Sequence, residues 1–414
     1  MRYINLVFRT IFFALLLFCI TIFTAVFILN RTVSHEYKIN RGDSFKIDSA
    51  IPVTADLSGV KADSGEFAEV GDVFSVDLKI FGIIPFTKAN VTVVEDTYVS
   101  VLGTPFGMKV YTDGVLVIEA GAVKTDSGSI NPSKLAGINV GDYIRRVNGR
   151  KITCNEDLSE LVSDSGGQPL KAEILRGKVK KTVYITPVLS SEEKIYRIGV
   201  WVRDSSAGVG TLTFYSPSND IVCGLGHGIC DSDTGKLLIP EHGELVGAEI
   251  ISVKKGEAGN PGELKGRFTL NKISDIILNT DNGVYGKPYS EMDTSNLTEI
   301  ALKQEVKDGD AQILCTVNGS APRLYSCKIE KRSAAYNSST QNMIVTVTDK
   351  ELLKITGGII QGMSGSPILQ NGRLAGALTH VFVDVPESGY AVYAENMFET
   401  AQKAAKNVAL KEAS

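Results

Sequence analysis

The chain has 414 residues, 43% hydrophobic and 22% charged, which suits two or three folded domains and excludes a disordered or collagen-like chain. Its 43 Lys and Arg against 47 Asp and Glu give a formal net charge of −4, which argues against a nucleic-acid partner because phosphates require a concentrated positive field. The 40 glycines indicate many turns, as in a β-rich protein, and six cysteines are too few for a disulfide framework.

The chain begins with an uncharged apolar run over residues 10–29. As a helix it would reach about 30 Å, the thickness of a bilayer's hydrocarbon core. Arg2 and Arg9 precede it without any acidic residue, which predicts a cytoplasmic N-terminus and places everything after Arg31 across the membrane. The alternative is a cleaved signal peptide, although its shorter apolar region and small-residue cleavage site are not evident. Both interpretations place the remainder outside the cytoplasm.

Residues 32–97 contain short apolar stretches separated by Gly and Asp, for example 73–86 and 90–102. The alternation in NVTVV is typical of strands. We expect a small β-rich region that links the membrane segment to the body of the protein, and no function follows from it.

Residues 98–190 show an ordered series of signals. The segment GTPFG at 103–107 precedes a β run, and residues 133–149 predict a short helix, a Gly-Asp turn and a strand that ends in an Asn-Gly hairpin. A helix capped by Asn155 and two closing strands follow. This order resembles a PDZ domain, with AGINVGDYIRRVNG as the most diagnostic stretch.

The PDZ resemblance implies a peptide-binding role for the loop before the second strand. In that family, backbone N–H groups of this loop hold a peptide's terminal carboxylate while the peptide adds as a strand. Here the resemblance points to Gly103, Phe106 and Gly107, in a loop that departs from the usual Gly-Leu-Gly-Phe type. The plainer alternative is a β-rich domain that only packs.

Two Gly-rich segments carry residues suited to covalent catalysis. One is centred on His227 and the other, GMSGSP, on Ser364. A serine hydroxyl needs a base to become a nucleophile, and histidine is the usual base near neutral pH. The developing oxyanion needs backbone donors, for which the N–H groups of Gly362 and Ser364 are the natural candidates.

The residues after the serine distinguish two hydrolase folds. An α/β-hydrolase elbow has the form G-x-S-x-G between a strand and a helix, but position 366 is Ser and two strand-like runs follow, joined at Asn371-Gly372. A serine placed before a hairpin favours a chymotrypsin-like double β-barrel. The order His227 then Ser364 agrees with that fold.

The acid that would orient the histidine is not fixed by spacing. Asp349 follows a predicted strand at 343–348 and could project inward from its end. An acid close to His227 could instead cap the local backbone. The candidates are Asp231, Asp233, Asp349 and Asp384.

Other interpretations of these segments remain open. The serine motif alone is often only a Gly/Ser turn. Cys223, His227 and Cys230 could bind zinc, but three local ligands at this spacing fit no standard structural site. His380 could be the base instead of His227. We expect no metal and no cofactor.

The chain closely resembles the SpoIVB peptidases, the stage IV sporulation serine proteases, from the membrane segment to about Met397. Four stretches carry the resemblance: RIGVWVRDSSAGVGTLTF, GLGHGICD, GGIIQGMSGSP and GALTHVFVD. It implies Ser364 as nucleophile, His227 as general base and Asp349 as the acid. Members of this family cross the forespore membrane, cleave themselves, and cut a membrane-bound partner, which releases an intramembrane protease that processes a mother-cell sigma factor.

Together these observations predict a mainly β protein with an N-terminal transmembrane helix, a small β region, a PDZ domain and a chymotrypsin-like protease domain. The expected boundaries are 1–31, 32–97, 98–190 and 191–414. The expected function is a membrane-anchored serine endopeptidase that cuts itself and a protein at the membrane, and is released by self-cleavage. The rival is a catalytically inactive, membrane-tethered PDZ scaffold.

Overall fold

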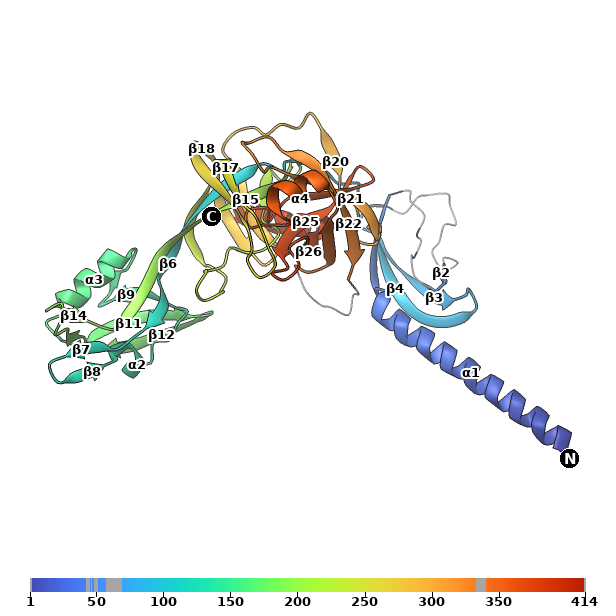
Figure 1. Ribbon diagram of the computed structural model, residues 1–414, viewed down its shortest axis with the longest axis horizontal. Coiled ribbons are helices and arrows are strands. Elements are labelled where there is room, and N and C mark those ends of the chain that lie inside the picture. The colour runs from blue at the N-terminus through green and yellow to red at the C-terminus, as the bar shows by residue number, and fades with distance from the viewer. Residues whose placement is uncertain are drawn as a thin grey trace.

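The computed structural model describes residues 2–41, 45, 47, 51–56, 69–332 and 340–412. Strands predominate, and they form a small sheet near the N-terminus, two barrels and a separate PDZ-like domain (Figure 1). The mainly β fold expected from the sequence is confirmed.

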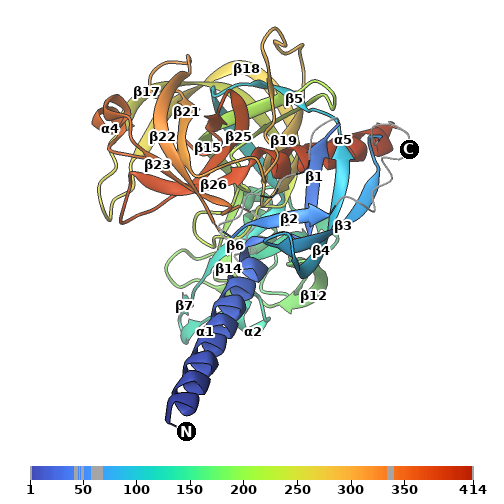
Figure 2. The same ribbon diagram turned by 90° about the vertical axis from the view of Figure 1, so that its right-hand side faces the viewer.

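The first element, α1 (Arg2–Thr32), is one long helix that projects away from both barrels (Figure 2). Its segment Ile11–Asn30 has a mean hydropathy of 2.9, which fits a single-pass anchor or a signal sequence. The last turn of α1 packs on a four-stranded sheet of order β1-β4-β3-β2. The strands are β1 (Glu36–Asn40), β2 (Val53–Asp56), β3 (Val73–Ile80) and β4 (Ile84–Val94).

The first barrel is a ring of six strands in the order β6-β17-β18-β19-β16-β15, closed by pairing between β6 and β15. Phe106, Leu212 and Leu245 belong to its apolar core. Short strands β5 (Tyr98–Val101) and β20 (Leu297–Glu299) extend it beside β15. The ring strands are β6 (Pro105–Ala120), β15 (Val200–Ser216), β16 (Ile221–Gly224), β17 (Pro240–Lys254), β18 (Glu263–Thr280) and β19 (Gly283–Pro288).

The PDZ-like domain is inserted between two strands of this barrel. The end of β6 and the start of β15 leave the ring and carry the domain, which lies apart at the left of Figure 1. Its apolar core includes Ile144, Leu158 and Ile174. The main elements are α2 (Pro132–Leu135), β9 (Asp142–Val147), α3 (Asn155–Ser163), β11 (Leu170–Arg176) and β12 (Val179–Ile185), with short strands β7 (Val123–Thr125), β8 (Gly128–Ile130), β10 (Arg150–Lys151), β13 (Val188–Leu189) and β14 (Tyr196–Arg197).

This insertion differs from the linear order of domains expected from the sequence. Residues 105–112 of β6 pair with residues 205–211 of β15 and with residues 240–247 of β17, so they belong to the protease barrel. A boundary at residue 98 therefore does not separate the PDZ domain from what precedes it. The long strands β6 and β15 serve both units.

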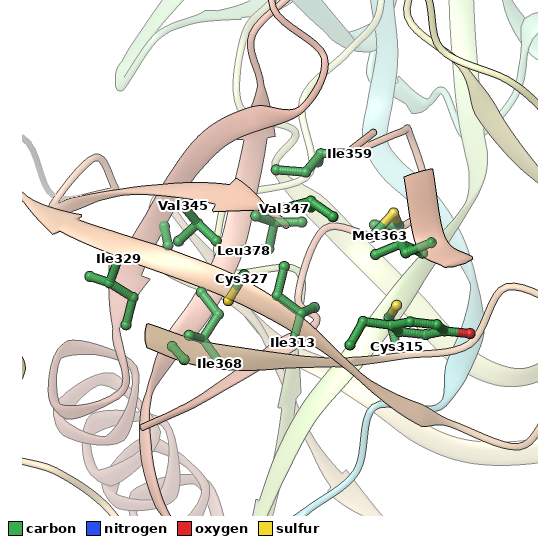
Figure 3. Packing of buried hydrophobic residues seen from close by; sticks show 14 of the residues in the cluster. Ile313, Cys315, Cys327, Ile329, Val345, Val347, Ile359, Met363, Ile368 and Leu378 are labelled. Atoms are coloured by element: carbon green, nitrogen blue, oxygen red, sulfur yellow. The ribbon is translucent and has the colours of Figure 1, made fainter. Parts of the chain in front are cut away.

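The second barrel is closed in the order β21-β22-β23-β26-β25-β24. Figure 3 shows its core, where Ile313, Val345 and Ile368 converge from different strands. The predicted turn at Asn371-Gly372 is confirmed, because Gln370 pairs with Arg373 across it. The elements are β21 (Gly309–Cys315), β22 (Arg323–Lys331), β23 (Met343–Val347), α4 (Lys350–Thr356), β24 (Pro367–Gln370), β25 (Arg373–Val381) and β26 (Ser388–Tyr393).

The C-terminal helix α5 (Ala394–Glu412) joins the two barrels and the N-terminal sheet. Its Met397 and Ala401 pack in one cluster with Phe214 of the first barrel and Val392 of the second. Lys38 of β1 pairs with two glutamates of α5, Glu395 at 2.9 Å and Glu399. The barrels thus share a buried seam, and the site described next lies where their loops meet.

Candidate active site

His227 follows the end of β16, on a turn that packs directly on the second barrel. Leu225 and Gly226 both have left-handed backbone, with φ of 68° and 66°. A Cβ on Gly226 would lie 3.1 Å from Thr379 Cγ2 and 3.2 Å from the Leu378 oxygen, both on β25. Glycine at this position therefore allows the close approach that brings His227 to β25.

Ser364 lies in the loop between α4 and β24, and the first barrel fixes this loop. The Thr211 N–H donates to the Ser364 oxygen at 2.9 Å, and Thr211 Oγ1 donates to the Gly362 oxygen at 3.0 Å. Thr213 Oγ1 donates to the Gly365 oxygen at 2.8 Å. Two threonines of β15 therefore satisfy three carbonyl groups of the loop and hold it against the first barrel.

Ser364 and His227 meet at two consecutive residues of β25. The Ser364 hydroxyl donates to the Thr379 oxygen at 2.7 Å. The ring of the next residue, His380, lies 4.6 Å from the His227 ring, centroid to centroid. Ser364 and His227 thus each contact one of two neighbouring residues of β25, and the Ser364 hydroxyl is engaged by a backbone carbonyl.

The protonation of His227 suits a general base. Its Nδ1 lies 2.8 Å from the Gly228 oxygen, and because a carbonyl only accepts, Nδ1 carries the hydrogen; Nε2 is then an acceptor, without a partner in the described part of the chain. Desolvation, with a smaller effect of His380, lowers the pKa of His227 to about 4, against the opposing effect of the Gly228 hydrogen bond. The imidazole is therefore neutral at pH 7.

The predicted oxyanion donors are available. Within the described chain, the N–H groups of Gly362 and Ser364 donate to no backbone or side-chain acceptor, whereas the N–H of Met363 between them bonds to the Ile360 oxygen. Gly362 has a φ of 95°, which aims its N–H in a direction that other residues rarely reach. Two free donors beside a serine are the arrangement that stabilises a tetrahedral oxyanion.

A cavity of about 670 Å³ adjoins Gly362, one of these two donors. Gln361 and Gly362 form one wall, and Val209, Leu264 and Phe268 of the first barrel lie on the others. A backbone bond from the Leu264 N–H to the Gln361 oxygen, 2.8 Å long, ties the two walls together. The site therefore has a partly apolar recess next to the position of the reacting carbonyl.

Asp349 is placed apart from His227, at the start of α4. Its carboxylate accepts hydrogen bonds from the N–H groups of Glu351 at 2.9 Å, Leu352 at 3.1 Å and Ser326 at 3.3 Å. These bonds, that of Leu352 first, lower its pKa. This is the geometry of a helix N-cap. No carboxylate hydrogen-bonds to His227 in the part of the chain that the structure describes.

The alternative acid closest in sequence, Asp231, is also occupied. It is 1% exposed, accepts from the Thr234 N–H at 2.8 Å, and pairs with Arg203 at 2.6 Å. Arg203 lies on β15 where that strand enters the PDZ-like domain. Asp231 therefore fixes the loop after His227 against this strand.

The described residues do not assemble a set of zinc ligands around His227. Cys223 is fully buried, and its thiol lies 3.6 Å from the Phe214 oxygen, whereas Cys230 is exposed. Burial raises the pKa of Cys223, which disfavours the thiolate that zinc requires. Among the described residues there is no group of three or more His, Cys, Asp or Glu side chains that could hold a metal ion.

The predicted peptide-binding loop lies in the first barrel. Phe106 is buried in the barrel core, a Cβ on Gly107 would clash with the ring of Phe268, and one on Gly103 would lie 2.7 Å from Leu314 Cγ. The assignment of Gly103, Phe106 and Gly107 to a PDZ groove is therefore corrected. The β run that follows them is a barrel strand in its first half and a PDZ strand only in its second.

A different groove runs along the PDZ-like domain. A cavity of about 560 Å³ lies between α3, which contributes Leu158 and Val162, and the segment 198–202. In the described pairing, residues 200–203 of β15 bond only to β6, so their other edge is open to an added strand. The sequence signal for this groove is Ile198-Gly199, which precedes a β run and lies some 90 residues after the GTPFG loop.

The fold and the site together define a serine endopeptidase with a double β-barrel and a PDZ-like domain. Residues 194–398 match the family model SpoIVB peptidase S55, the family that the sequence resembles. No curated protein matches the chain significantly.

Several solved structures are similar to parts of the chain. The PDZ domain of an SdrC-like protein from Listeria monocytogenes is 20% identical over 22% of this chain and 87% of that one, with a TM-score of 0.18. The thermostable serine protease AL20 from an extremophilic microorganism is 13% identical over 49% and 92%, with a TM-score of 0.29. The Rv3671c protease from M. tuberculosis, in its active form, is 15% identical over 47% and 72%, with a TM-score of 0.24.

Proposed function

We propose that this protein is a membrane-anchored serine endopeptidase of sporulation that cleaves itself and a membrane-bound regulatory protein. The single observation that carries the proposal is the meeting of Ser364 and His227 at Thr379 and His380, beside two free backbone donors. The family supports sporulation and a protein substrate. Relief of an intramembrane protease that processes a mother-cell sigma factor is the downstream step that the family resemblance implies.

The proposed reaction begins with a rotation of the Ser364 hydroxyl from the Thr379 oxygen to His227 Nε2. Oγ then attacks the peptide carbonyl carbon while its proton passes to Nε2, and the oxyanion is held by the N–H groups of Gly362 and Ser364. The C–N bond breaks as His227 returns the proton to the leaving amine. Water, deprotonated by His227, hydrolyses the acyl ester and restores the serine.

In this mechanism the Gly228 oxygen takes the part that a carboxylate usually takes. It holds the Nδ1–H of His227 at 2.8 Å and so fixes the tautomer and the ring orientation. Asp349 acts at a distance: by capping α4, it fixes the start of the segment that leads to Gly362 and Ser364. No metal takes part.

The proposed location is a single-pass membrane protein with its catalytic part outside the cytoplasm, released when the chain is cut between Arg31 and the first barrel. The length and apolarity of α1 support the anchor. The burial of Leu29 in the core of the N-terminal sheet supports a retained helix over a discarded signal peptide, because removal of the helix would expose that core.

The test compares the full chain in membranes, as wild type and as Ser364→Ala. We expect self-cleavage products only in the wild type, and N-terminal sequencing of the product identifies the cut bond. Ser366→Ala is a matched control, because Ser366 lies two residues after Ser364 and its buried hydroxyl has no hydrogen-bond partner among the residues that the structure describes. Products that persist in Ser364→Ala would contradict the proposal, and uncut protein in all three would favour the inactive PDZ scaffold.

A further inference from the structure

The turn between β3 and β4 exposes large apolar side chains at its tip. Residues 80–86, IFGIIPF, carry no charge, and Ile80 pairs with Ile84, so residues 81–83 form the tip. Phe81 is 59% exposed and Ile83 is 81% exposed. Phe81 also has a left-handed φ of 53°, a conformation that bulky residues seldom adopt. Exposing an aromatic and a β-branched side chain to water is unfavourable. Their presence at this turn indicates a surface that contacts an apolar partner.

The strand register places this tip on the side from which α1 arrives. β1 begins a few residues after α1 and runs parallel to β4, with Glu36 opposite Asn90. Because the two strands run in the same direction, residues 84–89 of β4 extend back beyond the start of β1, toward α1. Six residues of strand cover about 20 Å, so the tip lies well to the helix side of Glu36.

The packing of α1 places the sheet at the level of the apolar run. Leu29, which is 1% exposed, shares one cluster with Val76 of β3, and Val26 packs against it together with Ile84 and Phe86. These helix residues belong to the segment long enough to cross a membrane. In Figure 1 the β3–β4 hairpin extends from the domain in the same general direction as α1.

We propose that the tip formed by Phe81, Gly82 and Ile83 inserts into the lipid bilayer beside α1. The proposal rests on the membrane anchor proposed above. Because α1 ends at Thr32, the chain advances at most about 18 Å from Leu29 to Glu36, which is less than the reach of the hairpin, so the tip passes the end of the apolar run. At that depth Phe81 and Ile83 contact acyl chains in place of water. The tip would be a second membrane contact besides α1, and two contacts fix the orientation of the sheet relative to the membrane. The ion pair between Lys38 and α5 extends this orientation to the barrels.

The test uses the full chain reconstituted in vesicles of phosphatidylcholine and phosphatidylglycerol whose acyl chains carry bromine, which quenches tryptophan on contact. Ser364→Ala prevents self-cleavage, and Trp201→Phe removes the only native tryptophan. Ile83→Trp then reports the tip. Val73→Trp is the matched control, because Val73 lies at the other end of β3 and is 63% exposed. We expect severalfold stronger quenching at position 83 than at position 73.

Each outcome decides between the two proposals. Retention of the protein by the vesicles after an alkaline carbonate wash reports α1, and the contrast between the two tryptophans reports the tip. If the protein is retained but both tryptophans are quenched equally, the insertion is overturned and the anchor stands. A tryptophan at position 83 whose emission is blue-shifted but unquenched has the same consequence, because it would mean that protein, and not lipid, covers the tip. A protein that the wash removes overturns the anchor and the insertion together.

Discussion

The Thr379 backbone oxygen accepts a hydrogen bond from the Ser364 hydroxyl at 2.7 Å, while the ring of the next residue along β25, His380, lies tilted against the His227 ring at 4.6 Å. One strand of the second barrel therefore contacts both proposed catalytic residues. In the proposed mechanism, a χ1 rotation of Ser364 exchanges the Thr379 oxygen for His227 Nε2. We interpret the present arrangement as a resting state that substrate binding converts to the reactive one.

The pKa of His227, lowered to about 4, predicts activity that persists well below neutral pH. We expect kcat/KM for peptide cleavage to be constant from pH 7 to about pH 5 and to fall only as His227 itself becomes protonated. A protease with an unperturbed histidine would lose activity around pH 6.5. A pH–rate profile of the purified protein measures this directly, and a midpoint near 6.5 would contradict the buried, neutral imidazole.

The lowered pKa of His227 also makes the free energy of unfolding depend on pH. The unfolded chain binds a proton at His227 below about pH 6.5, whereas the folded protein does so only near pH 4, so the unfolded state binds more protons in that window. The free energy of unfolding should therefore fall as pH falls from 6.5 to 4, by up to about 3 kcal/mol from this residue. Denaturant unfolding of wild type and His227→Gln, compared at pH 7 and pH 5, isolates the contribution: the variant should show the smaller decrease.

Substitutions of Asp349 distinguish a role as the N-cap of α4 from a role as the acid that orients His227. Asp349→Ala removes the cap of α4 and should lower the free energy of unfolding by about 1 kcal/mol and slow cleavage. Asp349→Asn still caps, so it should retain most of the activity and stability. Unfolding curves and self-cleavage rates measure both effects. A loss in Asp349→Asn as large as in Ser364→Ala would show instead that the carboxylate charge acts on His227.

Gly362→Ala tests the oxyanion donor. At φ 95° an added Cβ is strained, and it would lie 2.9 Å from the Leu264 Cβ, so the N–H of residue 362 must turn away. We expect kcat to fall about 100- to 1,000-fold, as when other enzymes lose one oxyanion donor. Gly372→Ala is the control, because Gly372 has a φ of 78° and open space around it. Comparable losses in the two variants would mean that backbone strain alone, and not the donor, explains the effect.

Arg203 links the PDZ-like domain to the loop that follows His227. Arg203→Gln would leave the buried Asp231 without its cation, and we expect a loss of about 3 kcal/mol of stability together with slower cleavage. Arg150→Gln, whose partners Asp157 and Glu160 form an exposed network, should cost less than about 1 kcal/mol. Thermal unfolding and cleavage rates of both variants distinguish a buried linkage from a surface ion pair.

The Ser364–His227 pair could be proposed from the sequence because each residue lies in its own Gly-rich segment, where glycine permits the left-handed backbone that a tight turn requires. The β24–β25 turn was predictable for the same reason, since Asn371-Gly372 specifies a two-residue hairpin. These are properties of a few consecutive residues. They do not depend on distant partners.

The peptide groove and the domain order could not be predicted in this way. The partners of β6 in the barrel lie about 100 residues or more away, on β15 and β17, and no local pattern shows that one strand changes domains halfway along. The role of Asp349 was equally hidden, because an acid at a strand end can project inward or cap the next helix. Only the N–H groups of Glu351 and Leu352 decide between these roles.

The most direct test of the central claim is covalent labelling with an organophosphorus fluoride, which reacts with a serine only when a base activates it. Mass spectrometry of the labelled full chain should place one adduct on the peptide that contains Ser364, and His227→Gln should abolish it. An adduct that forms equally well in His227→Gln, or a protein that cleaves itself while Ser364 stays unlabelled, would contradict the Ser364–His227 pair.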